Sequence, residues 1–205
     1  MRRLSLAGGL LLLVAIWFGP LLDAWRGSFT AHMVAHMGVV AIAAPLIAIG
    51  LAARWRVHAS IPAYVAVLAS LLEFVAVWGW HAPALREAAE SSALVTAMEQ
   101  AIFLAVGLFL WTSSFAAPDE RSQAAAGAFS LLLTSMHMTL LGALLALAPR
   151  PLYGLGEVTC FGLVLDAGQD QQLGGVVMLL VGAVVYLAGG LLLMGRLLTQ
   201  SRTVQ

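Results

Sequence analysis

Six stretches of about 20 apolar residues follow one another along the 205-residue chain and leave little room for anything else. They cover approximately residues 4–22, 31–52, 61–80, 93–115, 123–148 and 173–198. A helix needs roughly 20 apolar residues to cross a bilayer, where every backbone polar group must be satisfied internally. Charged residues make up only 10%, against about 25% in soluble domains. The sequence therefore predicts an all-α, polytopic bundle of six membrane spans, forming a single domain over residues 1–205.

The arginines predict how this bundle is oriented. With six spans, one side of the membrane holds seven of the ten basic residues and the other side holds three. The first group is Arg2, Arg3, Arg54, Arg56, Arg121, Arg196 and Arg202, and the second is Arg26, Arg86 and Arg150. Because cytoplasmic loops carry an excess of arginine and lysine, both termini are expected in the cytoplasm.

A histidine–methionine repeat opens the second span. His32 and His36, and likewise Met33 and Met37, are four residues apart, which places each pair on one face of a helix. Neutral imidazole and thioether sulfur suit soft or borderline metals, copper above all, and ionisable groups inside apolar spans mark functional sites. The alternative is that methionine fills irregular helix contacts and that histidine near the surface is simply hydrated.

The fifth span contributes Met136-His137-Met138 near its middle. Successive helical residues turn by about 100°, so only His137 and at most one of the methionines can face a common site. A histidine at this depth is costly unless it binds a ligand or is paired. The alternative is a hydrogen bond from His137 to Glu99 or Glu73 on a neighbouring helix.

The remaining polar residues near the outer ends are assigned supporting roles. His81, at the Trp80-His81-Ala82-Pro83 corner, either binds metal at the site's entrance or is a plain interface residue. We expect Glu99 to orient a ligating imidazole, whereas Glu73 is open between that role, a neutral hydrogen-bonded acid and a proton relay. Asp170 is expected to support the site and to cap the last span.

In the long loop before that span, Arg150 is expected to pair with Asp166 or Asp170. The single cysteine, Cys160, excludes an intramolecular disulfide and a CxxC metal site, and a free apolar cysteine is the favoured interpretation. No nucleophile–base pair, phosphate-binding loop or HExxH motif is present, so we expect no enzymatic activity. Zero net charge without a basic tract argues against nucleic acid as a partner.

Several motifs together resemble one family. They are the HMxxHM repeat followed by Ala44-Pro45-Leu46, then Trp80-His81-x-Pro83-x-Leu85, Glu99-xxx-Phe103-Leu104 with Trp111, the run from Gly142 to Pro149-Arg150-Pro151-Leu152-Tyr153, and Asp170-Gln171-Gln172-Leu173-x-Gly175-xx-Met178. This pattern is similar to the CtaG-type polytopic cytochrome c oxidase assembly factors. The resemblance implies a multi-pass protein of the bacterial plasma membrane that is needed to make active haem–copper oxidase by handling copper.

From these residues we predict a Cu(I) site between the second, fourth, fifth and sixth spans. His36 and His137 are the expected core ligands, and Met33 or Met37 together with Met178 would supply sulfur. His32 and His81 would line the outer entrance, with Glu99 compensating the charge. Copper would arrive from an extracytoplasmic donor and pass to an oxidase subunit.

Three alternatives stay open at this point. A copper transporter would need ligands in the cytoplasmic half, where only Met194 lies. A b-type cytochrome would use His36 and His137 as axial haem ligands. The third alternative is an oxidase-binding scaffold without metal. Lipids surround the protein in every case, and the sequence leaves homo-oligomerisation open.

Overall fold

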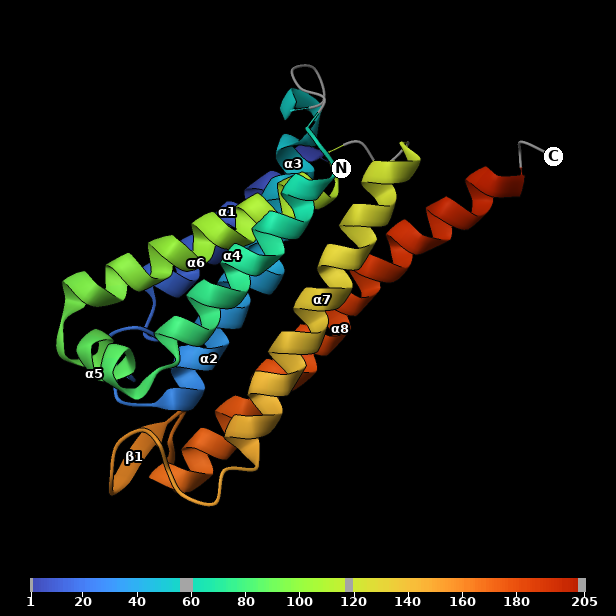
Figure 1. Ribbon diagram of the computed structural model, residues 1–205. Coiled ribbons are helices and arrows are strands. Elements are labelled where there is room, and N and C mark those ends of the chain that lie inside the picture. The colour runs from blue at the N-terminus through green and yellow to red at the C-terminus, as the bar shows by residue number, and fades with distance from the viewer. Residues whose placement is uncertain (1, 56–60, 117–119, 203–205) are drawn as a thin grey trace.

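The computed structural model describes residues 2–55, 61–116 and 120–202, which are mostly helical (Figure 1). In chain order the helices are α1 (Arg2–Phe18), α2 (Phe29–Met37), the π-helix η1 (Gly38–Ala43), α3 (Ala44–Trp55), α4 (Tyr64–Trp80), α5 (Pro83–Ser91), α6 (Ala93–Ser114), α7 (Arg121–Ala146) and α8 (Ala167–Arg202). Two short strands, β1 (Glu157–Cys160) and β2 (Leu163–Asp166), lie between α7 and α8.

Within the described residues, four continuous helical segments are long and apolar enough to cross a membrane. They are Phe29–Leu51, Ala93–Ser114, Arg121–Ala146 and Ala167–Thr199. The bent pair α4 and α5, which meet at 71°, makes a fifth if it counts as one span. The prediction of a helical membrane protein is confirmed. The number six and the cytoplasmic termini stay predictions, and Arg56, one of the arginines behind the orientation, lies outside the described residues.

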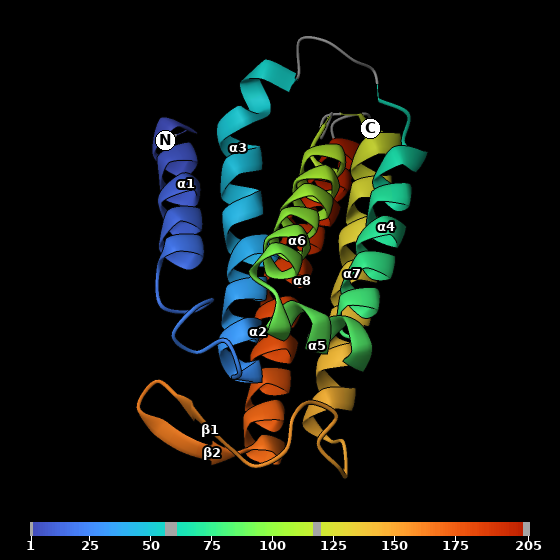
Figure 2. The same ribbon diagram turned by 90° about the vertical axis from the view of Figure 1, so that its left-hand side faces the viewer.

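The segment α2–η1–α3 forms the centre of the molecule. It packs against α1 on one side and against α6 and α8 on the others, and every residue of α2 except Val34 is buried. Helices α7 and α8 form a long antiparallel pair, and α4 lies between α6 and α7 (Figures 1 and 2). Both chain ends lie at one end of the molecule, and α5 and the strands lie toward the other.

Pro45 explains the π-helical turn in this central segment. In η1 the backbone N–H of Ala44 bonds to the carbonyl of Val39, five residues back. The next carbonyl, that of Val40, would need the N–H of residue 45 in this register, and proline has none. The indole of Trp111 on α6 donates to the Val40 carbonyl instead, at 3.0 Å. A buried acceptor is thereby satisfied, and α6 is fixed against the central segment.

The two strands form an antiparallel hairpin in which Cys160 pairs with Leu163. Its two-residue turn, Phe161 and Gly162, has positive φ at both positions, 50° and 80°, as a type I′ turn requires. The Phe161 ring lies 4.5 Å from that of Trp25, which holds the hairpin against the segment between α1 and α2. The sequence predicted only a long loop here.

Candidate functional site

Three histidines meet near the end of the molecule opposite the chain termini. His32 and His36 project from α2, and His81 directly follows α4. Their ring centres lie 6.3 Å (His32–His36), 5.9 Å (His32–His81) and 5.3 Å (His36–His81) apart. Phe103 of α6 closes the inner side, 4.1 Å from the His36 ring. All three histidines are buried, so the cluster lies inside the protein rather than at its surface.

The hydrogen bonds of the cluster leave at least one nitrogen of each ring without a partner. Nδ1 of His81 lies 2.6 Å from the carbonyl of Val77, and because a carbonyl only accepts, Nδ1 carries the proton and Nε2 carries a lone pair. Arg86 donates to Nδ1 of His32 at 3.0 Å. Nε2 of His32, His36 and His81 has no hydrogen-bond partner, and neither has Nδ1 of His36. Buried polar atoms without partners are rare.

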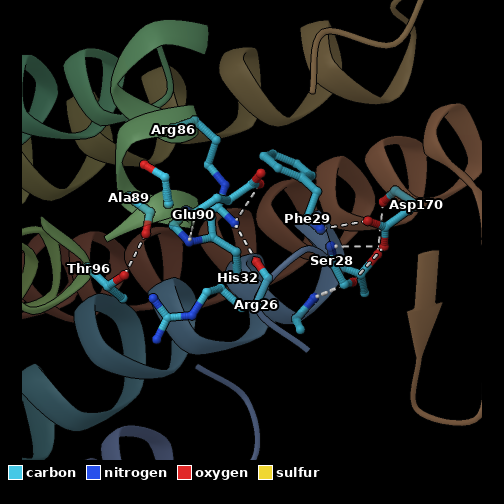
Figure 3. A network of polar contacts seen from close by, with 12 residues as sticks. Arg26, Ser28, Phe29, His32, Arg86, Ala89, Glu90, Thr96 and Asp170 are labelled. Carbon is cyan, nitrogen blue, oxygen red and sulfur yellow. Dashed lines mark hydrogen bonds and ion pairs between the residues drawn. The ribbon is translucent and has the colours of Figure 1, made fainter. Parts of the chain in front are cut away.

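Arg86 lies over the cluster because α5 folds back across it (Figure 3). Its guanidinium also donates to the carbonyl of Arg26 at 3.3 Å and pairs with Glu90 at 3.0 Å. Glu99 of α6 completes this polar layer, with Oε2 3.6 Å from Nδ1 of His32. Since Nδ1 accepts from Arg86, the contact with Glu99 is electrostatic rather than a hydrogen bond. Neither carboxylate oxygen of Glu99 has a hydrogen-bond partner.

Asp170 anchors the start of α2. Its carboxylate accepts from the hydroxyl of Ser28 at 2.8 Å and from the backbone N–H groups of Phe29 and Thr30 at 2.6 and 3.1 Å (Figure 3). The expectation that Asp170 caps its own helix is therefore wrong: it lies inside α8 and caps α2. Asp166 is the residue whose carboxylate accepts from the start of α8, at the N–H of Gln169.

The loop after α7 closes the site from outside. Tyr153 stacks on Phe29 with ring centres 4.4 Å apart, and its hydroxyl donates to the backbone carbonyl of His81 at 2.7 Å. Gln171 accepts from the N–H of Leu152 and donates to the carbonyl of Leu145. Burial raises the pKa of Tyr153 to about 12, so the phenol remains a donor at neutral pH. Sequence reasoning gave Arg86, Phe103 and Tyr153 no role in the site, although the last two belong to the motifs quoted above.

The methionines of the repeat face a different helix from the histidines. A Cβ at Gly174 of α8 would lie 3.0 Å from Cγ of Met33, and one at Gly182 would lie 3.6 Å from Cε of Met37. Met33 and Met37 therefore pack on α8, whereas His32 and His36 point toward α4, α5 and α6. Met178 is fully buried in the same apolar core as these two methionines.

His137 does not join the cluster. Its ring packs edge-on against Phe74 of α4 at 5.2 Å, and neither ring nitrogen has a hydrogen-bond partner. The alternative bond to Glu73 or Glu99 is therefore not formed either, and Oε1 of Glu73 accepts instead from the hydroxyl of Tyr186 at 2.9 Å. The structure thus pairs His36 with His81, where the sequence predicted His137.

Cys160 and Arg150 lie apart from this chemistry. Cys160 is buried in the hairpin, and burial raises the pKa of its thiol, which favours the interpretation of a free, unreactive cysteine. Arg150 is exposed, and among the described residues it forms no ion pair with Asp166 or Asp170. The expected pairing across the loop is therefore wrong.

We asked whether the cluster fits a metal ion. In the part of the chain that the structure describes, no three His, Cys, Asp or Glu side chains are arranged to hold one directly. When two imidazoles bind one metal ion, with metal–nitrogen distances of about 2.0–2.1 Å, their ring centres lie about 5–5.5 Å apart. The observed 5.3–6.3 Å exceeds this by at most about 1 Å. The donor types and the free nitrogens fit, and the rings would have to turn and draw together.

A cleft leads toward this cluster from the side. It lies between the end of α1, the segment that follows it, and the start of α6, and has a volume of about 730 Å³. Gln100 lines it, and both amide atoms of this buried side chain lack a partner. A much smaller pocket shares Leu22, Arg26 and Thr96 with the cleft and reaches His32 and Arg86. His32 and Arg86 thus lie side by side in the lining of the pocket that adjoins the cleft.

Comparison with known families agrees with these residues. The family described as cytochrome c oxidase caa3 assembly factor (Caa3_CtaG) matches residues 1–200. The chain belongs to this family. No curated protein matches it, and no solved structure does. The resemblance read from the motifs is confirmed.

The motifs of this assembly factor also meet in space. The residues concerned come from four helices and a loop. They are His32, His36, His81, Glu99, Phe103, Tyr153, Asp170 and Gln171. All of them form the cluster, line it or fix the elements that carry it. Many of the motif residues quoted above therefore build this site, whereas Pro45 and Trp111 lie elsewhere.

Proposed function

We propose that this cytochrome c oxidase assembly factor binds Cu(I) between His32, His36 and His81 and passes it to an oxidase subunit. The observation that carries the proposal is the set of three buried imidazoles whose Nε2 atoms have no partner. Burying polar groups without partners costs free energy, and a bound ion would recover it. The role is binding and transfer, not catalysis.

The donor set favours copper. Cu(I) accepts few ligands and binds imidazole well, and neutral nitrogen donors in an apolar pocket suit a monovalent ion. Glu99, with both carboxylate oxygens free, supplies a compensating negative charge beside His32. Because Nδ1 of His32 accepts from Arg86, the ring proton is on Nε2, so His32 can bind copper only after Arg86 leaves Nδ1. This makes Arg86 a gate for an incoming ion.

The direction of transfer follows from the topology that we propose. Six spans, with α1 and α4 included, put both termini on one side of the plasma membrane, and the arginine asymmetry favours the cytoplasm. The histidine cluster then lies in the outer half, where an extracytoplasmic donor would deliver copper. Because the chain ends lie opposite the cluster (Figure 1), this orientation is consistent with the fold.

The alternatives gain less support. A b-type haem would need His36 and His137 on facing helices, but their rings contact different neighbours, Phe103 and Phe74. A metal-free scaffold accounts for oxidase assembly without explaining the unpaired imidazoles.

Copper content after anaerobic Cu(I) loading of the detergent-purified chain tests the proposal. We expect about one copper per chain, lost in His36→Ala and in His81→Ala. His137→Ala is the matched control, since it removes a buried histidine that also lacks hydrogen bonds. It should keep its copper.

Circular dichroism and gel filtration of each variant would establish that the fold is intact. Copper lost in His137→Ala but kept in His81→Ala would overturn the assignment in favour of the site expected from sequence. Copper absent from the native chain would favour the scaffold. A Soret band in protein made with ample haem would favour the cytochrome.

A further inference from the structure

A second cavity lies at the opposite end of the molecule from the histidine cluster. It is an apolar groove of about 610 Å³ between α3, α6 and α8. Its walls come from three sequence segments, residues 45–49, 111–116 and 184–192, and two arginines complete it, Arg2 and Arg196. No part of the copper proposal involves this groove.

Toward the chain termini, α8 diverges from α7 (Figure 1). At Gly189 the ring of Trp111 lies so near that a Cβ would be 3.0 Å from it. Trp111 therefore forms the floor, and its indole N–H is already bonded to the Val40 carbonyl. The Trp111 ring is largely buried and stacks against Tyr186 and Phe115. Pro45, Ile49 and Leu192 supply much of the apolar lining.

Among the described residues, every charged side chain that lines the groove is positive. These are Arg2, at the start of α1, and Arg196, near the end of α8, and both are exposed. Among the described residues neither arginine forms an ion pair. Apolar walls that end at two unpaired guanidinium groups complement a molecule with acyl chains and a negatively charged phosphate.

We propose that this groove is a specific site for an anionic phospholipid, whose chains lie along α3, α6 and α8 and whose phosphate binds Arg2 and Arg196. Each basic residue near an anionic headgroup contributes enough to change the dissociation constant about fivefold, so the pair changes it about 30-fold. A zwitterionic lipid, with its own positive group beside the phosphate, loses most of this preference.

Native mass spectrometry of the detergent-purified chain, titrated with phosphatidylglycerol or phosphatidylcholine of identical acyl chains, tests the proposal. We expect tighter binding of phosphatidylglycerol by at least about tenfold. Arg2→Gln and Arg196→Gln should each weaken it about fivefold and the double variant about 30-fold. Arg3→Gln and Arg121→Gln are matched controls. Both arginines are exposed in the first turns of helices, at the end of the molecule that holds the chain termini, but neither lines the groove.

Two further measurements separate the acyl chains from the phosphate. Ala188→Leu places a larger side chain in the groove without removing charge, and it should weaken both lipids. Millimolar inorganic phosphate should not displace phosphatidylglycerol. Equal binding of the two lipids, equal effects of control and groove arginines, or no retained lipid would each overturn the proposal. The last result would leave the groove to a helix of another protein, such as an oxidase subunit.

Discussion

Asp170 acts as a helix cap from 142 residues away in the sequence. Its carboxylate accepts three hydrogen bonds at the start of α2, the helix that carries His32 and His36. In Asp170→Asn an amide NH2 group replaces one carboxylate oxygen. This group is a donor, and it would face N–H groups that are also donors. We expect the free energy of unfolding to fall by about 2–3 kcal/mol, measured by thermal or denaturant unfolding in detergent.

The control for this change is Asp23→Asn. The Asp23 side chain is 93% exposed and forms an ion pair with Arg26 at 3.7 Å. Exposed ion pairs contribute little, so its removal should change stability by less than about 0.5 kcal/mol. If the two variants were equally stable, the cap would not hold α2 in place.

The raised pKa of Tyr153 should make the free energy of unfolding depend on pH in the alkaline range. Its pKa is raised to about 12 in the folded protein, above about 10 in an unfolded chain. The stabilisation from the neutral phenol is therefore complete below pH 10 and is lost as the pH rises toward 12. The unfolding free energy of the native chain should fall by about 2 kcal/mol more than that of Tyr153→Phe over this interval.

Tyr153→Phe keeps the stacking on Phe29 and loses only the hydrogen bond to His81. At pH 8 it should be less stable than the native chain by about 1 kcal/mol. Parallel pH profiles of the two proteins would mean that the phenol does not titrate in this environment.

The composition of the histidine cluster illustrates what sequence alone can predict at this scale. The spacing of His32 and His36 placed them correctly on one face. It could not decide which histidine from elsewhere meets them, because that depends on how α4 and α7 are rotated about their axes. The rotation follows from packing over the whole interface, so the sequence led to His137 as the core ligand and placed His81 only at the entrance.

At the scale of helices, α7 and α8 pack through glycine. A Cβ at Gly142 would lie 2.7 Å from the backbone N of Leu179 and 2.8 Å from the carbonyl oxygen of Gly175. Backbone cannot move aside as a side chain does, so Gly142→Ala must separate the helices. We expect a loss of about 1–3 kcal/mol, measured as a lower unfolding midpoint.

Gly195→Ala is the matched control on α8. A Cβ at this position meets nothing within 4 Å, and alanine is the better helix former by about 0.5–1 kcal/mol. The control should be as stable as the native chain or slightly more so. A comparable loss in both variants would show that helix propensity, not close packing, governs these positions.

Hydrophobic pattern predicted these helices well because membrane spans are long and nearly uniform. The six expected stretches correspond to α1, α2–η1–α3, α4, α6, α7 and α8. The β-hairpin and η1 were not predicted. The hairpin depends on a turn at Phe161 and Gly162 that has no strong sequence signal, and η1 depends on the contact between the Val40 carbonyl and Trp111. Local composition cannot reveal such a contact.

At the scale of the whole molecule, the two ends differ in chemistry. The end with α5, Tyr153 and the hairpin carries buried imidazoles under aromatic side chains. The end with the chain termini carries arginines and the apolar groove. A protein that receives copper on one side of the membrane and binds anionic lipids on the other would need two ends of different chemistry. The two ends lie on opposite sides of the membrane only if the chain has six spans with both termini in the cytoplasm.

Labelling of single cysteines in intact cells tests that topology. The native chain has one thiol, Cys160, which is buried and has a raised pKa, so it should not react with a membrane-impermeant maleimide. Leu155→Cys, at a position 93% exposed beside the hairpin, should be labelled from outside. Glu120→Cys, exposed before α7, should react only after the cells are broken.

The opposite pattern would place the histidine cluster toward the cytoplasm, and copper would then have to come from a cytoplasmic donor. Labelling of both positions from outside would mean that α7 does not cross the membrane, since it alone separates residue 120 from the hairpin. Either result would require a different direction of transfer, while the copper stoichiometry of His36→Ala and His81→Ala would stand independently. The topology and the metal site are thus separate predictions, and only their combination makes this chain an extracytoplasmic copper donor to the oxidase.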